Sequence, residues 1–106
     1  MMNTDDVAKC FGELGHVHRL EAYRLLVKAS PDGLTVGEIQ QHLGLPKSTF
    51  SHHLERLAHV GLITQQREGR SIRCFADCNR MARLVGFLAN ECCTGVTVSS
   101  VLETAG

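Results

Sequence analysis

Apolar residues recur at helical spacing along the first third of the chain. The two stripes consist of Val7, Phe11 and Leu14, and of Leu20, Tyr23, Leu26 and Val27. Residues spaced three, four and seven positions apart share one face of a helix. The stripes therefore predict one amphipathic helix that starts near Thr4 and a second from about His18 to Ala29. The second is ended by four turn-forming residues, Ser-Pro-Asp-Gly, at positions 30–33.

Two further short helices are predicted on either side of a tight turn. Thr35 and Glu38 have the spacing of a capping box, which opens a helix that runs through His42 and closes at Gly44. The next helix occupies Pro46–Gly61, because the missing amide hydrogen of proline costs nothing at a helix start. Its buried stripe is expected to consist of Phe50, Leu54, Leu57 and Val60.

The remaining pattern predicts a hairpin followed by one more helix. Leu62–Arg67 and Ser71–Ala76 read as two strands around the glycine-centred turn Glu68–Arg70. Asp77 or Asn79 can cap the last helix. That helix is expected to bury one face, made of Met81, Leu84, Val85 and Leu88.

The predicted order is α-α-α-α-β-β-α, a mainly α (α+β) fold. Two short helices joined by a glycine-containing turn and followed by a two-stranded ribbon form a winged helix-turn-helix. The 106 residues leave room for one domain, residues 1–93, with a flexible tail over 94–106. A chain of this size buries only a modest fraction of its surface, so dimerisation is an expected source of stability.

Charge is distributed unevenly along a chain whose formal net charge is zero. Residues 47–73 hold five arginine and lysine residues against two glutamates, a local excess of three positive charges. His52, His53 and His59 add hydrogen-bond donors to the same stretch. A basic stretch on a compact domain predicts double-stranded operator DNA as the partner.

The start of the helix at 46–61 suits the major groove of DNA. Short polar side chains and one cationic side chain lie at this end, whereas the apolar face of the helix is expected to pack against the rest of the domain. The candidate contacts to bases and phosphates are Lys47, Ser48, Thr49, Ser51 and His52. Arg67, Arg70 and Arg73 on the ribbon are candidate contacts to phosphates or to a narrow minor groove.

Other classes of protein receive less support from the sequence. No glycine-rich phosphate loop, Gly-x-Ser-x-Gly or His-Glu-x-x-His motif is present, so we do not expect an enzyme. A protein–protein adaptor on the same fold stays open as an alternative. No apolar run is long enough to cross a membrane, and the N-terminus lacks a signal peptide, so we expect a cytoplasmic protein.

The five cysteines are Cys10, Cys74, Cys78, Cys92 and Cys93. In a reducing compartment an odd number argues for free thiols. Cys92 is predicted to continue the apolar stripe of the last helix, with Cys93 turned about 100° away. Adjacent soft thiolates favour thiophilic ions such as trivalent arsenic or antimony. The alternative is two small residues at a fraying helix end.

Several runs within roughly residues 11–91 together form a family pattern. They are Leu25-Leu26, Thr35-Val36-Gly37-Glu38-Ile39, Ser51-His52-His53-Leu54-Glu55-Arg56-Leu57, Gly61-Leu62-Ile63 and Arg67-Glu68-Gly69-Arg70. These runs resemble the ArsR/SmtB family of bacterial metalloregulatory repressors. The resemblance implies a homodimer formed by the first and last helices, which binds an operator palindrome and releases it when an inducer binds.

Two metal motifs of that family are absent here. The Cys-x-Cys that many members carry falls on Thr35 and Gly37, and all six histidines precede residue 60, which leaves the zinc pattern of the last helix unfilled. We therefore expect no zinc at the usual family sites. Some arsenite-responsive members carry a cysteine pair at the end of the last helix, which implies a trivalent arsenic or antimony inducer at Cys92 and Cys93.

More than one set of ligands is possible for an inducer bound at Cys92 and Cys93. In a dimer of this type Cys10 lies beside the partner's last helix, so it is a candidate third ligand, whereas packing in the core is the simpler role. With two thiols only, a methylated arsenical suits the pair better. A redox or persulfide switch ranks second, because the helix C-terminus and Glu91 disfavour the thiolate and a vicinal disulfide is strained. Cys74 is expected to face the core, and Cys78 has no evident partner.

Overall fold

A computed structural model describes residues 2–96, without the side chain of Lys47. Of the predicted tail, residues 97–106 lie outside the described residues. The elements are α1 (Thr4–Leu14), α2 (Val17–Lys28), β1 (Leu34–Thr35), α3 (Val36–Leu43), α4 (Lys47–His59), β2 (Ile63–Glu68), β3 (Ser71–Ala76) and α5 (Cys78–Ala89). The five predicted helices and the hairpin are confirmed, and their boundaries differ from the predicted ones by a few residues at most, α5 excepted.

The short strand β1 was not predicted. It pairs antiparallel with β3, Leu34 opposite Cys74 and Thr35 opposite Arg73, so the sheet has the order β1-β3-β2. Two residues are too few to show an alternating pattern, and β1 exists because β3 offers it hydrogen-bonding partners. This strand ties the start of α3 to the base of the hairpin.

The helix ends follow local chemistry. The capping box of α3 is confirmed: the Glu38 amide donates to Thr35 Oγ1 at 3.2 Å, and the Thr35 amide donates to Glu38 Oε1 at 2.9 Å. Gly44 ends α3 at φ 68°, a left-handed conformation that glycine adopts without a steric cost. This cap sharpens the turn into α4. Asp77 caps α5 by accepting from the Arg80 amide at 3.0 Å.

The core forms where α1, α2, α4 and the sheet meet. Its buried residues are Val7, Cys10, Leu14, Ala22, Tyr23, Leu26, Ile39, Phe50, Leu54, Leu57, Leu62, Ile63, Cys74 and Leu84. The stripe predicted for α2 is wrong in part, because Leu20 and Val27 are 44% and 41% exposed. Ala22 replaces them on the buried face, since α2 must pack against several elements at once.

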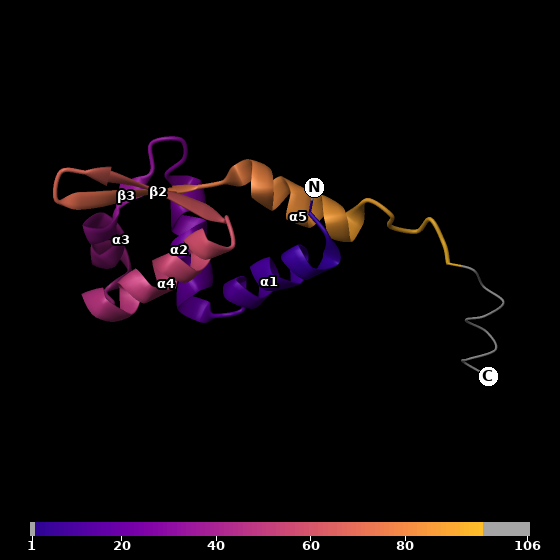
Figure 1. Cartoon of the computed structure of the whole chain (residues 1–106), viewed down its shortest axis with the longest axis horizontal. Coiled ribbons are helices and arrows are strands. Elements are labelled where there is room, and N and C mark those ends of the chain that lie inside the picture. The colour runs from indigo at the N-terminus through magenta and orange to yellow at the C-terminus, as the bar shows by residue number, and fades with distance from the viewer. Residues whose placement is uncertain (1, 97–106) are drawn as a thin grey trace.

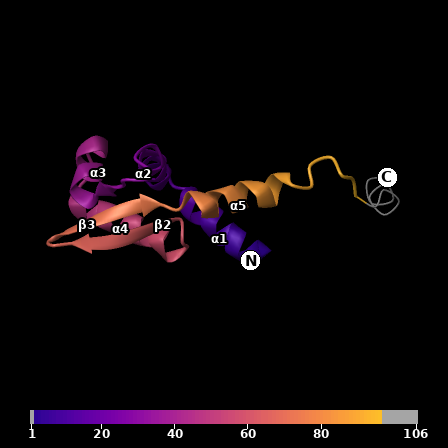
Figure 2. The same cartoon turned by 90° about the horizontal axis from the view of Figure 1, so that it is seen from above.

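The helices and strands are distributed between two ends of the described molecule. The β2–β3 hairpin and α3 lie at one end, and α1 and α5 lie next to each other at the other end in both views (Figures 1 and 2). The prediction that the last helix continues through Cys92 is wrong, because α5 ends at Ala89. None of the helices within residues 2–96 is both long and apolar enough to span a membrane.

Candidate nucleic-acid interface

The start of α4 presents unpaired amides and small polar side chains. Pro46 is the N-cap and supplies no side-chain hydrogen bond, so the first amides of α4 remain free to donate. Ser48 and Thr49 are exposed, whereas Phe50 is fully buried and anchors the helix. A helix start with free amides and a positive dipole end attracts phosphate oxygens. Lys47 is the first residue of α4, and its side chain is outside the described part.

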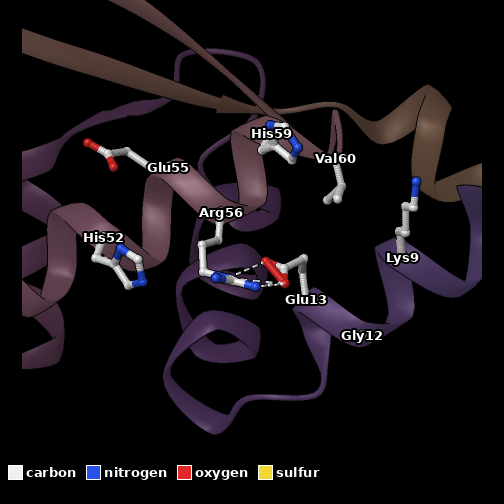
Figure 3. A pocket seen from close by; sticks show the side chains of 8 residues that line it. All are labelled: Lys9, Gly12, Glu13, His52, Glu55, Arg56, His59 and Val60. Atoms are coloured by element: carbon white, nitrogen blue, oxygen red, sulfur yellow. Dashed lines mark hydrogen bonds and ion pairs between the residues drawn. The ribbon is translucent and has the colours of Figure 1, made fainter.

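Ser51 lies apart from the other short polar residues of α4. It is half-buried in a groove of about 330 Å³ between α3 and the hairpin, which Arg70 and Ile72 also line. His52, by contrast, is exposed on the opposite flank of α4 (Figure 3). The predicted candidates on α4 therefore face three directions: outward at Ser48 and Thr49, toward the hairpin at Ser51, and toward α1 at His52.

The three arginines of the hairpin have different surroundings. Arg67 and Arg70 flank the Gly69 turn and are exposed, and among the described residues neither has an ion-pair partner. Arg73 donates from Nε to Glu68 Oε2 at 2.8 Å and from one guanidinium nitrogen to the Gly33 carbonyl at 3.3 Å. The hydrogen bond to Glu68 is the main cause that raises the pKa of Arg73. Arg73 thus braces the base of the hairpin against the loop before β1.

Arg56 is also bound to another residue of the protein. Its guanidinium donates three hydrogen bonds of 2.7 to 3.1 Å to the Glu13 carboxylate on α1 (Figure 3). Arg19 of α2 adds a fourth at 3.0 Å. The Arg56 hydrogen bond is the largest cause of a lowered pKa at Glu13. The positive excess counted along residues 47–73 therefore overstates the free charge, because Arg56 is neutralised by a residue outside that stretch.

The groove in Figure 3 separates α1 from the outer flank of α4. It has a volume of about 590 Å³ and is lined by Lys9, Gly12, Glu13, His52, Glu55, Arg56, His59 and Val60. Its lining residues carry both signs of charge, and the ion pair between Arg56 and Glu13 spans it. His53, which the sequence predicted as a further donor of this stretch, does not line the groove and is only 7% exposed.

Cys92 and Cys93 lie in a turn beyond α5. Their Sγ atoms are 3.5 Å apart and both residues are exposed. The turn is held by the Cys92 amide, which donates to the Ala89 carbonyl at 2.9 Å, and by Thr94 Oγ1, which donates to the Glu91 carbonyl at 2.9 Å. Cys93 has a φ of 63°, which brings the adjacent thiols to the same side. Both sulfurs can therefore reach a single atom.

The other three cysteines lie elsewhere. Cys10 is fully buried, and its thiol donates to the Val60 carbonyl at 3.4 Å. Cys74 is buried as predicted, and burial raises the pKa of its thiol. Cys78 is exposed, with its sulfur 3.7 Å from Ser30 Oγ. Across residues 2–96 of one protomer, no three histidine, cysteine or carboxylate side chains are placed together to hold a metal ion.

Comparison with known proteins points to one class. A family model described as a helix-turn-helix domain matches residues 14–66. The HTH-type transcriptional regulator CmtR of Mycobacterium tuberculosis is 39% identical over 66 residues, which is 61% of this chain. The matched part spans 55% of that relative's length, little more than half.

Solved structures match over a longer part of the chain. The crystal structure of an ArsR family transcriptional regulator superposes with a TM-score of 0.73 at 19% identity, and covers 85% of this chain and 90% of that one. The solution structure of the homodimeric winged helix-turn-helix DNA-binding domain of Mb0332 from Mycobacterium bovis gives a TM-score of 0.65 at 29% identity, with 82% and 81% covered. The expected winged helix-turn-helix fold is confirmed.

Proposed function

This chain belongs to the helix-turn-helix domain family and has the winged fold of ArsR-family regulators, and from this premise we propose that it is a homodimeric repressor of operator DNA. A trivalent arsenic or antimony species bound by Cys92 and Cys93 releases it. The observation that carries the proposal is the exposed start of α4, with free amides and small polar side chains. Beside it, Arg67 and Arg70 of the β2–β3 hairpin have no ion-pair partner among the described residues.

We call α4 the recognition helix and the β2–β3 hairpin the wing. Ser48 and Thr49 at the helix start are short enough to let the backbone approach base edges, and Lys47 adds a cation there. Arg67 and Arg70 on the wing reach phosphates on the flank of the site. Arg73 contributes less, because it must leave Glu68 before it can bind a phosphate. Each phosphate contact makes the affinity more sensitive to salt.

The dimer forms through α1 and α5. On α5, Val85, Phe87 and Leu88 are 56%, 45% and 67% exposed in the single protomer, although they belong to a helix with a buried residue at Leu84. Burying side chains of this size contributes about 1.5–3 kcal/mol each. The homodimeric state of the Mb0332 domain supports a dimer. A two-fold dimer presents two recognition helices and therefore reads a palindrome.

The inducer is taken up by a two-thiol site. Cys92 and Cys93 offer two sulfurs 3.5 Å apart in water, a bite that suits one thiophilic centre. Inorganic arsenite needs a third thiolate, and Cys10, even from the partner subunit, would first have to leave the core where it is fully buried. The pair therefore suits a methylated trivalent arsenical, which has two exchangeable positions. An arsenical bound at the end of α5 can lower DNA affinity only if it binds more tightly to a dimer arrangement that does not fit the operator than to the arrangement that does.

The redox alternative rests on the same two sulfurs. Peroxide can oxidise the exposed pair to a disulfide, with two electrons and two protons passing to peroxide to give water. Adjacent residues form a strained disulfide, which makes this product easy to reduce. The arsenical is favoured because it requires no change of the turn that places both sulfurs on one side.

The test is a gel shift on duplex DNA from the promoter region of the chain's own gene. The complex is challenged with arsenite, methylarsenite, antimonite, zinc, cadmium and peroxide, in wild type, Cys92→Ser, Cys93→Ser and the double variant. Cys78→Ser serves as the matched control, since Cys78 is also exposed. We expect methylarsenite to release wild type and Cys78→Ser at the lowest concentration and to leave the double variant bound.

Three results would contradict parts of the proposal. Release that survives the double substitution removes Cys92 and Cys93 from the sensor. Release by peroxide at lower concentration than by any arsenical favours the redox alternative. Duplex binding that is weak and insensitive to salt contradicts the repressor itself and favours an adaptor, because phosphate contacts release counterions.

A further inference from the structure

Three histidine rings meet where the recognition helix packs on the start of α2. The ring centroid of His53 lies 4.4 Å from that of His16 and 6.1 Å from that of His18, and His16 and His18 are 5.5 Å apart. His16 is the N-cap of α2, and its Nδ1 accepts from the His18 amide at 3.2 Å. The contact between His16 and His53 joins the start of α2 to the middle of α4.

His53 is the only polar residue in the described part that is classed as buried with the core. Its Nδ1 is inaccessible to solvent and has no hydrogen-bond partner among the described residues. A buried ring nitrogen without a hydrogen-bond partner favours the neutral imidazole over the cation. Its neighbours on α4, Leu54 and Phe50, are fully buried, so His53 is fixed in place by the packing of the helix.

The charged groups around His53 act in the same direction. His16, Arg19 and His18 on α2 face it, and His52 is its neighbour on α4 at 6.4 Å between ring centroids. The nearby carboxylates have other partners: Glu13 of α1 binds Arg19 and Arg56, and Glu21 lies 3.5 Å from His18. Burial first, and then the Coulombic effect of these neighbouring side chains, lower the pKa of His53. We do not expect a metal ion to bind at the three histidines. Arg19 faces them with a positive charge, and within the described residues the three rings are not placed to bind one ion together.

We propose that the contact between His16 and His53 is a proton-sensitive hold on the recognition helix, so that acid loosens α4 from α2 and lowers the affinity for DNA. The neutral rings pack against each other and keep α4 seated. A proton on His53 places a cation next to Arg19, whose carboxylate partner Glu13 is already shared with Arg56. Relief requires the start of α2 and the middle of α4 to separate, which disturbs the start of α4, about one and a half turns from His53.

The direction in which DNA affinity changes in acid distinguishes this contact from a simple effect of added positive charge. His52 is exposed on the flank of α4, and protonation of an exposed histidine adds positive charge that would strengthen binding to phosphates. Loosening at His53 weakens binding instead. The DNA part of the inference rests on the proposed function, whereas the proton-linked packing of α2 and α4 is measured without DNA.

The test follows the full-length protein from about pH 8 to about pH 5, the range in which histidine titrates. Duplex affinity is measured by fluorescence anisotropy, and the midpoint of urea unfolding is measured on the same samples. The variants are His53→Gln, which cannot titrate, and His16→Asn, which keeps the N-cap acceptor and removes the ring. His42→Gln on α3 is the matched control, because His42 is exposed and lies outside the cluster.

We expect wild type and His42→Gln to lose affinity in acid by up to about tenfold per pH unit for each linked proton. His53→Gln should lose the decline of affinity in acid, and His16→Asn should show a shallower decline than wild type. His16→Asn carries the test alone if His53→Gln fails to fold. The inference is overturned if affinity rises in acid, if His53→Gln keeps the wild-type slope, or if the urea midpoint falls in acid while affinity stays constant. Absence of duplex binding at pH 8 contradicts the proposed function. In that case the urea midpoints test the contact between His16 and His53: a midpoint that falls in acid in wild type and not in His53→Gln supports it, and equal behaviour contradicts it.

Discussion

Arg56 of the recognition helix and Glu13 of α1 form a bidentate ion pair, with both Glu13 oxygens within 2.7 to 3.1 Å of the Arg56 guanidinium. Because Arg19 of α2 binds the same carboxylate at 3.0 Å, one side chain links three helices. Glu13 is only 14% exposed, whereas Arg56 is 49% exposed, so water screens part of the interaction. The link sets the position of α4 relative to the helix that we assign to the dimer interface.

Glu13→Gln should lower the free energy of unfolding by about 1–3 kcal/mol, since it leaves the nearly buried Arg19 without its charge partner. The pKa of Glu13 is lowered in the folded protein. Its contribution is therefore fully present above the ordinary glutamate pKa and is lost as the pH falls through the lower folded value. Urea unfolding of wild type and variant at several pH values measures both effects. Glu21→Gln, which removes an exposed carboxylate, is the control, and an equal loss in both variants would contradict the special role of Glu13.

Arg70→Ala and Arg73→Ala should separate DNA contact from wing stability. Arg70 has no ion-pair partner in the described residues, so its removal should reduce the salt dependence of duplex binding by about one unit of slope. Arg73 is held by Glu68 and the Gly33 carbonyl, so its removal should mainly lower the thermal midpoint of unfolding. Anisotropy titrations at several salt concentrations and thermal scans give the comparison. A larger change of slope in Arg73→Ala would reverse the assignment.

Leu88→Glu should dissociate the dimer. Leu88 is 67% exposed on α5 of one protomer, next to Val85, and a buried unpaired charge at such a contact costs several kcal/mol. Sedimentation equilibrium should show monomers at concentrations where wild type is dimeric. Ile72→Glu places the same charge on an exposed apolar residue of the wing and should leave the dimer intact. If Ile72→Glu dissociates the dimer and Leu88→Glu does not, the interface lies elsewhere.

Cys10→Ser tests the role of the buried thiol. Cys10 is fully buried and donates to the Val60 carbonyl at 3.4 Å, so the serine hydroxyl keeps the bond but loses the apolar packing of sulfur. We expect a loss of about 1–2 kcal/mol in the free energy of unfolding and no change in release by methylarsenite. Cys10→Ala controls for the hydrogen bond. Loss of arsenical response in both variants, with folding intact, would make Cys10 a ligand after all.

The elements were predictable where a short stretch of chain carries its own signal. The capping box at Thr35 and Glu38, the stripe of Phe50, Leu54 and Leu57, and the turn at Gly69 are all local, and the structure has each of them. The winged helix-turn-helix follows from their order. The helix end at Ala89 was missed because apolar spacing through Cys92 cannot reveal where backbone hydrogen bonding stops.

The sequence predicted which elements form the candidate DNA-binding site, but it did not predict which of their basic side chains are free to bind DNA. Counting residues along 47–73 treated every basic side chain as free, but Arg56 is bound by Glu13, 43 residues away, and Arg73 is tied to the Gly33 carbonyl, 40 residues away. Likewise a histidine on a helix carries no sign that its neighbours will bury it. Only spatial packing turned His53 from a surface donor into a buried group next to His16.

Local patterning thus decided the type, order and approximate limits of the helices and strands, because hydrophobic periodicity and capping act within a few residues of the chain. Packing decided which polar groups remain available for DNA, which are used in ion pairs, and which are buried. It also added β1, whose two residues are a strand only because β3 lies beside them. The reason is physical: burial and charge pairing depend on neighbours in space, and those neighbours exist only once the chain has folded.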